Sequence, residues 1–259
     1  MVQSMTMTDT EKARMRLLDA FRQIQDRAHA ASIPVRIIGS IAVQLRCPES
    51  ASRAARGRHF ADIDLVAYKR DAARLRPLIE TLGYTEHRDV FAVSEGGRAI
   101  FDHPHTAVHV DVFFDRLDFC HCIMVRNRLE IHEATLPLAE LLLGKLQIVE
   151  INEKDLRDAT ALLLDHEVGF DDTGINSAHI AALCAADWGL WRTVRLNLDK
   201  LSQYAAHHGD LSTKEARLAS LRLARLNTMI DAEPKPLKWR MRAQIGDRLK
   251  WYKDVEEVD

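Results

Sequence analysis

The chain has 259 residues, of which 47% are hydrophobic and 29% charged: enough apolar material for one large or two modest globular domains, and too much for a disordered chain. It has no run of about 18 apolar residues, so we expect no membrane-spanning helix and no membrane partner. The formal net charge of -2 conceals 14 basic against 6 acidic residues over 191–253, a balance compatible with a nucleic-acid or nucleotide partner. No signal-peptide pattern precedes the first helix and there are only four cysteines, so we expect a cytoplasmic protein with reduced thiols.

Strand and helix patterns alternate through the first 135 residues. Thr8 and Glu11 form a capping-box pattern before apolar residues at helical spacing, and Pro34 favours an extended chain after that helix. The expected elements are a helix to about residue 31, a strand at 35–38, a short helix at 40–45, a strand at 60–68, a helix at 71–83, a hairpin of 90–93 with 98–102, and a strand at 106–114. Together they predict an α/β (α+β) fold class with a small mixed-sheet domain over residues 1–135.

Residues 47–59 interrupt this alternation. The segment is polar, contains Arg53, Arg56 and Arg58, and lacks apolar periodicity, so we expect a mobile loop. Guanidinium groups bind phosphate through two donors at once, and the loop is therefore a candidate to close over a nucleotide or its acceptor. The alternative is a solvated insertion without function.

The second half changes character after Pro137. Its apolar residues recur at helical spacing, with a break expected near Trp188-Gly189. The expected helices cover residues 138–151, 153–166, 175–206, 213–230 and 237–250. We therefore expect an all-helical domain over residues 136–259.

Three carboxylates stand inside strand-like apolar runs. Asp62 and Asp64 are two residues apart and so leave the same face of their strand, and Asp111 lies between two valines of another. An apolar run is a costly place for an ionised carboxylate without a partner. If the two strands are neighbours the three groups converge, and such carboxylates hold one or two Mg²⁺ ions. The alternative is that they are simply the polar faces of amphipathic strands.

With Gly39-Ser40 after the first strand, this pattern resembles the nucleotidyltransferase superfamily, whose signature is Gly-Ser, then Asp-x-Asp, then one acid on a neighbouring strand. The resemblance implies that Asp62, Asp64 and Asp111 hold Mg²⁺, that Gly39 and Ser40 bind the triphosphate of an NTP, and that Asp111 takes the proton of an attacking hydroxyl. Twenty-one residues separate Ser40 from Asp62, whereas the resemblance leads one to expect roughly ten to thirteen.

A second pattern lies in the helical half. Lys145 stands among leucines and is followed by Lys154-Asp155-Leu156-Arg157-Asp158, which looks like the motif of AbiEii-like nucleotidyltransferases and related toxins. A lysine flanked by leucines needs an anion, because its ammonium cannot stay dry unpaired. The resemblance implies that Lys145 faces the triphosphate, with Asp155 or Asp158 orienting it, and we favour Asp158. The alternative is that Lys145 reaches solvent along an amphipathic helix.

The expected function is a metal-dependent nucleotidyltransferase that moves an NMP from an NTP, such as ATP, to a hydroxyl acceptor. An RNA end, a protein side chain and a small molecule such as an aminoglycoside all stay open as acceptors. The basic second half favours RNA, as in the toxin relatives, and the sequence leaves open whether there is an antitoxin partner. The alternative is a non-catalytic nucleotide-sensing or partner-binding module on the same fold.

Overall fold

The computed structural model describes residues 8–56, 58–207 and 209–254. The chain forms two compact units, each built from several segments. Unit 1 comprises Met1–Ala42, Ala55–Arg116 and Met124–Leu136, and unit 2 comprises Val43–Ala54, Leu117–Ile123 and Pro137–Asp259. The division into domains at 1–135 and 136–259 stays a prediction, and the units assign two short segments of the first half to unit 2.

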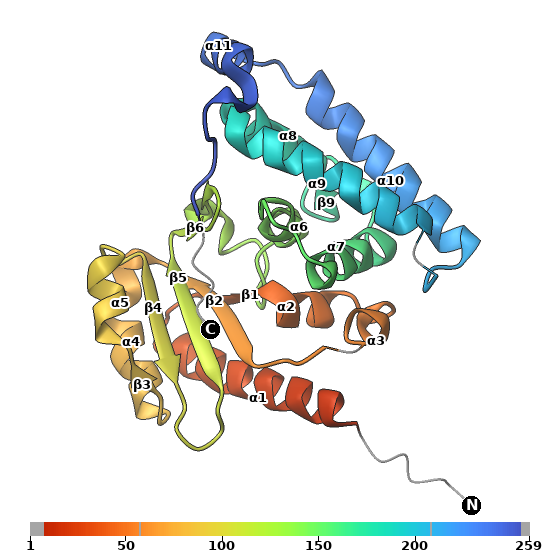
Figure 1. Ribbon diagram of the computed structural model, residues 1–259. Coiled ribbons are helices and arrows are strands. Elements are labelled where there is room, and N and C mark those ends of the chain that lie inside the picture. The colour runs from red at the N-terminus through yellow and green to blue at the C-terminus, as the bar shows by residue number, and fades with distance from the viewer. Residues whose placement is uncertain (1–7, 57, 208, 255–259) are drawn as a thin grey trace, which may run out of the picture. The chain divides into compact units, whose positions relative to one another are not determined.

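Unit 1 is organised around a five-stranded mixed sheet in the order β1-β2-β5-β4-β3 (Figure 1). The strands are β1 (Val35–Ile38), β2 (Asp62–Ala67), β3 (Thr85–Glu86), β4 (Arg98–Asp102) and β5 (His109–Phe114). β2 and β5 are parallel, whereas β1–β2, β4–β5 and β3–β4 are antiparallel. The expected class, a small mixed sheet combined with many helices, is confirmed.

The helices of unit 1 are α1 (Asp9–Ala30), α4 (Ala72–Thr81) and α5 (Arg88–Val93), and α2 (Gly39–Arg46) begins in this unit. α1 and α4 bury apolar residues, whereas no residue of α5 is fully buried. The predicted capping box of α1 is present, because Thr8 and Glu11 exchange side-chain bonds with each other's backbone N–H groups. Leu17, Phe21 and Ile24 of α1 are buried, and the helix packs against β1 and β2. This burial stabilises the sheet on which the carboxylates lie.

The expected hairpin at 90–102 is wrong in its first arm. Residues 88–93 form α5, and a turn with Glu95 and Gly96 at positive φ leads into β4. Phe91 explains the helix, since its ring packs edge-on against Phe114 with centroids 6.0 Å apart, while Val93 is 85% exposed. A short apolar run does not distinguish a one-sided helix turn from a strand.

The expectation of an open mobile loop over residues 47–59 is also wrong for its first part. A one-turn helix, α3 (Ala51–Ala54), lies within it and packs on α7 (Glu153–Asp165) inside unit 2. The carboxylate of Asp165 accepts hydrogen bonds from the backbone of Glu49 and Ser50 and from the Ser50 hydroxyl, the last at 2.5 Å. A single helical turn is too short to show apolar periodicity, so its sequence resembles a loop.

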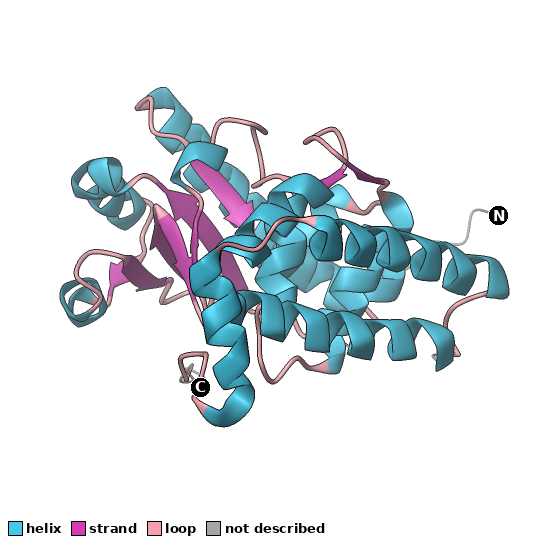
Figure 2. Cartoon of the chain, turned by 90° about the horizontal axis from the view of Figure 1, so that it is seen from above, coloured by secondary structure: helices cyan, strands magenta, loops and turns pink. Residues whose placement is uncertain are grey.

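Unit 2 is a set of packed helices with two short strand pairs. Besides α3 and α7, the helices are α6 (Leu138–Leu146), α8 (Ser177–Ala186), α9 (Trp188–His207), α10 (Thr213–Ala232) and α11 (Leu237–Ile245). The short strands are β6 (Arg116–Asp118) with β7 (Cys122–Met124), and β8 (Val168–Gly169) with β9 (Ile175–Asn176). α10 packs on both α8 and α9, and Figure 2 shows long helices of the chain lying side by side.

The predicted helix break near Trp188-Gly189 is confirmed. α8 ends at Ala186 and α9 starts at Trp188, because the carboxylate of Asp187 accepts hydrogen bonds from the N–H groups of Gly189 and Leu190. This is the capping arrangement that begins a new helix. Within the described parts of the chain, no helix has the length and apolar character that crossing a bilayer requires.

Candidate functional site

Unit 1 brings two of the three predicted carboxylates directly opposite each other. β2 and β5 are neighbours in the sheet, and Asp64 is the register partner of Asp111. Asp62 lies two residues earlier on β2, opposite His109. Residues two apart on a strand share a face, so all three carboxylates belong to one face of the sheet. The expectation that the two strands are adjacent is therefore confirmed.

The three carboxylates differ in exposure. Asp62 is exposed and Asp64 half-buried, whereas Asp111 is only 5% exposed. Asp111 is buried although it lies on the same face of the sheet as the exposed Asp62, and the side chain of Arg98 contacts it. Burial raises the pKa of Asp111 by disfavouring its charged form, and the nearby guanidinium of Arg98 opposes that rise.

Arg98 is the group that covers Asp111. Its Nε lies 3.0 Å from Oδ1 and 2.9 Å from Oδ2, and its Nη2 lies 2.6 Å from Oδ2. Arg98 stands on β4 opposite Phe113, so it reaches Asp111 diagonally across the strand pair. Burial lowers the pKa of Arg98, but the hydrogen bonds and charge of Asp111 and the charge of Asp64 outweigh this and raise it. The guanidinium is therefore a fixed positive charge beside both opposed carboxylates.

The hydroxyl of Ser94 fixes the backbone from which Arg98 projects. Ser94 Oγ accepts a hydrogen bond from the Arg98 N–H at 3.0 Å and lies 3.1 Å from the Arg98 carbonyl oxygen, to which it can donate. The Arg98 side chain is about one-third exposed and passes over the ring of Phe113 at 5.4 Å. The turn before β4 thus positions Arg98 at the edge of the cluster formed by Asp62, Asp64 and Asp111.

Gly39 lies against Asp64 of the carboxylate cluster. It follows β1 at the point where Ile38 pairs with Asp64, and its φ of +67° favours glycine. A Cβ built on Gly39 would lie 2.0 Å from Oδ2 of Asp64, so the carboxylate packs directly on the backbone of the turn. The Gly39-Ser40 pair, chosen from the sequence as a candidate, therefore lies beside Asp64 for a steric reason that the sequence does not show.

The donor set fits a hard divalent cation in its chemistry. Mg²⁺ prefers carboxylate oxygens, and Asp62 and Asp64 supply them from one strand. However, the described residues contain no group of three or more His, Cys, Asp or Glu side chains gathered closely enough to hold a metal ion. Both oxygens of Asp111 are bonded to Arg98. Asp62 and Asp64 are thus the residues of unit 1 that would hold such an ion.

Lys145 and Asp158 lie in unit 2 and belong to a buried ion cluster. Lys145 Nζ lies 3.0 Å from Asp155 Oδ1 and 2.9 Å from Asp158 Oδ2. The lysine side chain is 12% exposed and that of Asp158 is fully buried. Lys145 therefore does not reach into solvent, and both aspartates of the predicted motif contact its ammonium. Asn152 caps α7 and so fixes the turn that carries Asp155.

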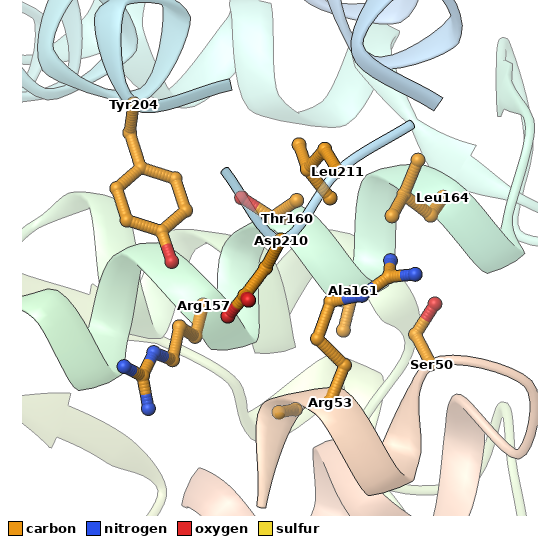
Figure 3. A pocket seen from close by; sticks show the side chains of 10 residues that line it. Ser50, Arg53, Arg157, Thr160, Ala161, Leu164, Tyr204, Asp210 and Leu211 are labelled. Atoms are coloured by element: carbon orange, nitrogen blue, oxygen red, sulfur yellow. The ribbon is translucent and has the colours of Figure 1, made fainter. Parts of the chain in front are cut away.

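Unit 2 also contains a small pocket (Figure 3). Its labelled side chains come from α3 and the residue before it, from α7, from α9 and from the segment before α10: Ser50, Arg53, Arg157, Thr160, Ala161, Leu164, Tyr204, Asp210 and Leu211. The space admits little more than one water molecule. Arg53, which the sequence offered for a phosphate, is paired with Glu215 at 2.6 Å. The pocket is a feature of internal packing.

Arg98 is the site residue that sequence reasoning missed. One signal was available, because Arg98 is separated by one residue from the buried Ile100, so it lies on the same strand face as the residue that pairs with Asp111. Without knowledge that β4 and β5 pair, the arginine looks like the solvated start of an edge strand.

No protein-family profile and no curated protein matches the chain. Among solved structures, the chain is similar to the antibiotic-resistance factor ANT(2'')-Ia, described in solution with substrate-regulated conformation dynamics. The sequence identity is 10%, the match covers 76% of this chain and 100% of that chain, and the TM-score is 0.42.

Proposed function

We propose that this protein is a nucleotidyltransferase that binds an NTP on unit 1 and moves its NMP to a hydroxyl acceptor. The observation that carries the proposal is the contact between the Gly39 turn and Asp64, directly opposite Asp111 on a parallel strand. A tight glycine turn beside opposed carboxylates combines a backbone that phosphate can approach with acids that can hold its counter-ion.

The triphosphate is assigned to Gly39 and Ser40, and the sequence motif adds Lys145 and Asp158 as nucleotide-binding residues. Gly39 and Ser40 open α2, and the free backbone N–H groups at a helix start favour an anion. The Ser40 hydroxyl adds a donor. Lys145 supplies a positive charge, and Asp158 holds its ammonium in place. Replacing Lys145 with alanine is expected to weaken NTP binding about tenfold, or about 1.4 kcal/mol.

In the proposed reaction, the acceptor oxygen forms a bond to the α-phosphorus while the bond from that phosphorus to the β-bridging oxygen breaks, and pyrophosphate leaves. The acceptor proton passes to Asp111. A carboxylate has about four acceptor sites, and Arg98 approaches Asp111 with two N–H donors, Nε and Nη2, which leaves acceptor capacity for this proton. Mg²⁺ bound by Asp62 and Asp64 would neutralise phosphate charge.

The acceptor is an RNA end, a protein side chain or a small molecule such as an aminoglycoside. Residues 191–253 carry 14 basic against 6 acidic residues, which favours RNA as in toxin-like nucleotidyltransferases. Such a toxin would need an antitoxin partner.

The test is incubation of the protein with each α-labelled NTP, Mg²⁺ and total cellular RNA, followed by separation of RNA, protein and small products. We expect label from one NTP in one product class, lost in Asp64→Asn and retained in Asp102→Asn. Asp102 is a suitable control because it lies on the same sheet but binds His87 and His109. Absence of label from all three classes would contradict the proposal.

A second candidate is a non-catalytic nucleotide-binding module. The observation that favours this candidate is that Arg98 hydrogen bonds to both carboxylate oxygens of Asp111, the proposed proton acceptor. This candidate predicts NTP binding that depends on Gly39 and Asp64, measured by calorimetry, with no labelled product under any of the conditions above.

A further inference from the structure

The cluster of three carboxylates in unit 1 already includes a positive charge from the protein, the guanidinium of Arg98. Arg98 approaches Asp111 with Nε and Nη2 and makes three contacts of 3.0 Å or less. Asp111 is 5% exposed, so an ionised carboxylate there requires a counter-charge. Asp64 lies directly opposite and adds its own field to the same guanidinium. Arg98 thus neutralises Asp111, the buried one of the three aspartates.

We propose that Arg98 is the permanent counter-ion of Asp111, taking the place that a second metal ion would occupy. On this assignment a divalent cation binds only through Asp62 and Asp64. The inference rests on the proposed function in taking this group as the cation-dependent nucleotide site, and it reduces the expected one or two ions to one.

The geometry of the Arg98 fork on Asp111 is consistent with this assignment. A second divalent ion on Asp111 would have to displace a bidentate arginine, whose geometry matches a carboxylate. Removing one partner of a buried ion pair is strongly destabilising, because the other charge loses its counter-charge. The resident guanidinium therefore has the advantage over an ion from solution.

A second arginine–carboxylate pair, between Arg76 of α4 and Glu86 of β3, provides a matched control. Arg76 binds Glu86 with Nε at 2.5 Å from Oε1 and Nη2 at 3.0 Å from Oε2, and the Glu86 side chain is 2% exposed. Arg76 also lies 3.7 Å from the centroid of Phe91. Like Arg98, it makes a forked bond to a buried carboxylate of the sheet, but its acid belongs to β3 and is not one of the three site carboxylates.

The test titrates the metal-free protein with Mn²⁺ and follows free Mn²⁺ by electron paramagnetic resonance. The expected result is one Mn²⁺ per chain, with binding at least tenfold weaker in Asp62→Asn. The paired variant R98Q/D111N, in which two neutral amides can bond to each other, should keep Mn²⁺ affinity within twofold of the wild type. Thermal unfolding should show that this paired variant is folded.

Freeing Asp111 gives the opposite result. In Arg98→Gln, Asp111 loses its counter-ion and becomes available as a third ligand, so Mn²⁺ affinity should rise about tenfold. Arg98→Lys, which keeps the charge without the fork, should fall between the two. Arg76→Gln should leave Mn²⁺ affinity unchanged, which separates a local effect at Asp111 from general loosening of the sheet.

Two Mn²⁺ per chain, or a tenfold loss of affinity in R98Q/D111N, would overturn the assignment, because Asp111 would then be a metal ligand in the native protein. Unchanged affinity in Arg98→Gln, or no Mn²⁺ binding by any variant, would also overturn it. The expected Mn²⁺ results without any labelled transfer product would support Arg98 as counter-ion and contradict the transferase proposal alone.

Discussion

The two units each bury a charged cluster, and the clusters differ in how far they are exposed to solvent. In unit 2, Lys145 lies between Asp155 and Asp158, and all three side chains are at most 15% exposed. In unit 1, Arg98 contacts the buried Asp111, whereas Asp62 is exposed and Asp64 half-buried. The side chains of the first cluster are thus nearly all removed from solvent, whereas the second includes carboxylates that solvent reaches.

This difference separates a cluster that stabilises the fold from one that can recruit a ligand. Buried charges must be paired within the protein, whereas a carboxylate that solvent reaches is accessible to a cation from solution. By the same reasoning, any role of Lys145 in nucleotide binding must compete with its two aspartates. The substitutions below test this comparison, in order of decreasing expected effect.

The largest effect is expected at Asp64. Asp64→Asn should reduce NMP transfer at least a thousandfold, or about 4 kcal/mol of transition-state stabilisation, because it removes a charge from the carboxylate cluster of unit 1. Steady-state rates with the labelled NTP measure this. Asp102→Asn is the control, and equal losses in both variants would mean that the effect is general to the sheet.

The next effect concerns stability and belongs to the cluster around Lys145. Asp158→Ala should lower the free energy of unfolding by about 3 kcal/mol, because it removes a partner from a buried ion pair. Asp155 is 15% exposed, so Asp155→Ala should cost less, about 1 kcal/mol. Urea unfolding of both variants checks the order. Mn²⁺ affinity that falls in Asp158→Ala would argue that the two clusters are functionally linked.

Gly39→Ala is expected to cost about 2 kcal/mol of folding free energy and to weaken Mn²⁺ binding, because the new Cβ strains the positive φ and pushes Asp64 away. Gly144→Ala is the matched control. A Cβ at Gly144 meets nothing within 4 Å, and alanine there should stabilise the helix by up to about 1 kcal/mol. Equal behaviour of the two alanine variants would contradict the steric role of Gly39.

The smallest effect is a pH dependence in unit 2. Hydrogen bonds from Ser212, followed by Arg53, lower the pKa of Glu215 from 4.5 to about 2. A lowered folded-state pKa means that the stabilisation is complete above about pH 4.5 and is lost as the pH falls toward 2. The pair is partly exposed, so the effect is on the order of 1 kcal/mol. Urea midpoints from pH 2 to 6 should fall more steeply for wild type than for Glu215→Gln.

Much of this fold follows from local patterns in the sequence. The capping box at Thr8, the strand before Gly39 and the helix break at Asp187 are all decided by residues close together in the chain. The pairing of Asp64 with Asp111 follows from alternation along two strands, once those strands are taken as neighbours. Local chemistry and a period of two residues are sufficient for these features.

The features that could not be predicted depend on partners distant in sequence. Ser50 and Glu49 are ordered by Asp165, more than one hundred residues later, so their segment looked like a loop. Arg98 comes within reach of Asp111 only because β4 pairs with β5. Burial of Asp111 likewise depends on that arginine. Charge balance in a site is a property of the assembled sheet.

A crystal structure of the protein with Mn²⁺, with the ion located by the anomalous signal of manganese, tests directly whether the cation binds at Asp62 and Asp64 while Arg98 neutralises Asp111. We expect one anomalous peak within bonding distance of Asp62 and Asp64, with the Arg98 fork still on Asp111. A peak bound to Asp111, or no peak at Asp62 and Asp64 while one is found beside Asp155 and Asp158, would contradict it.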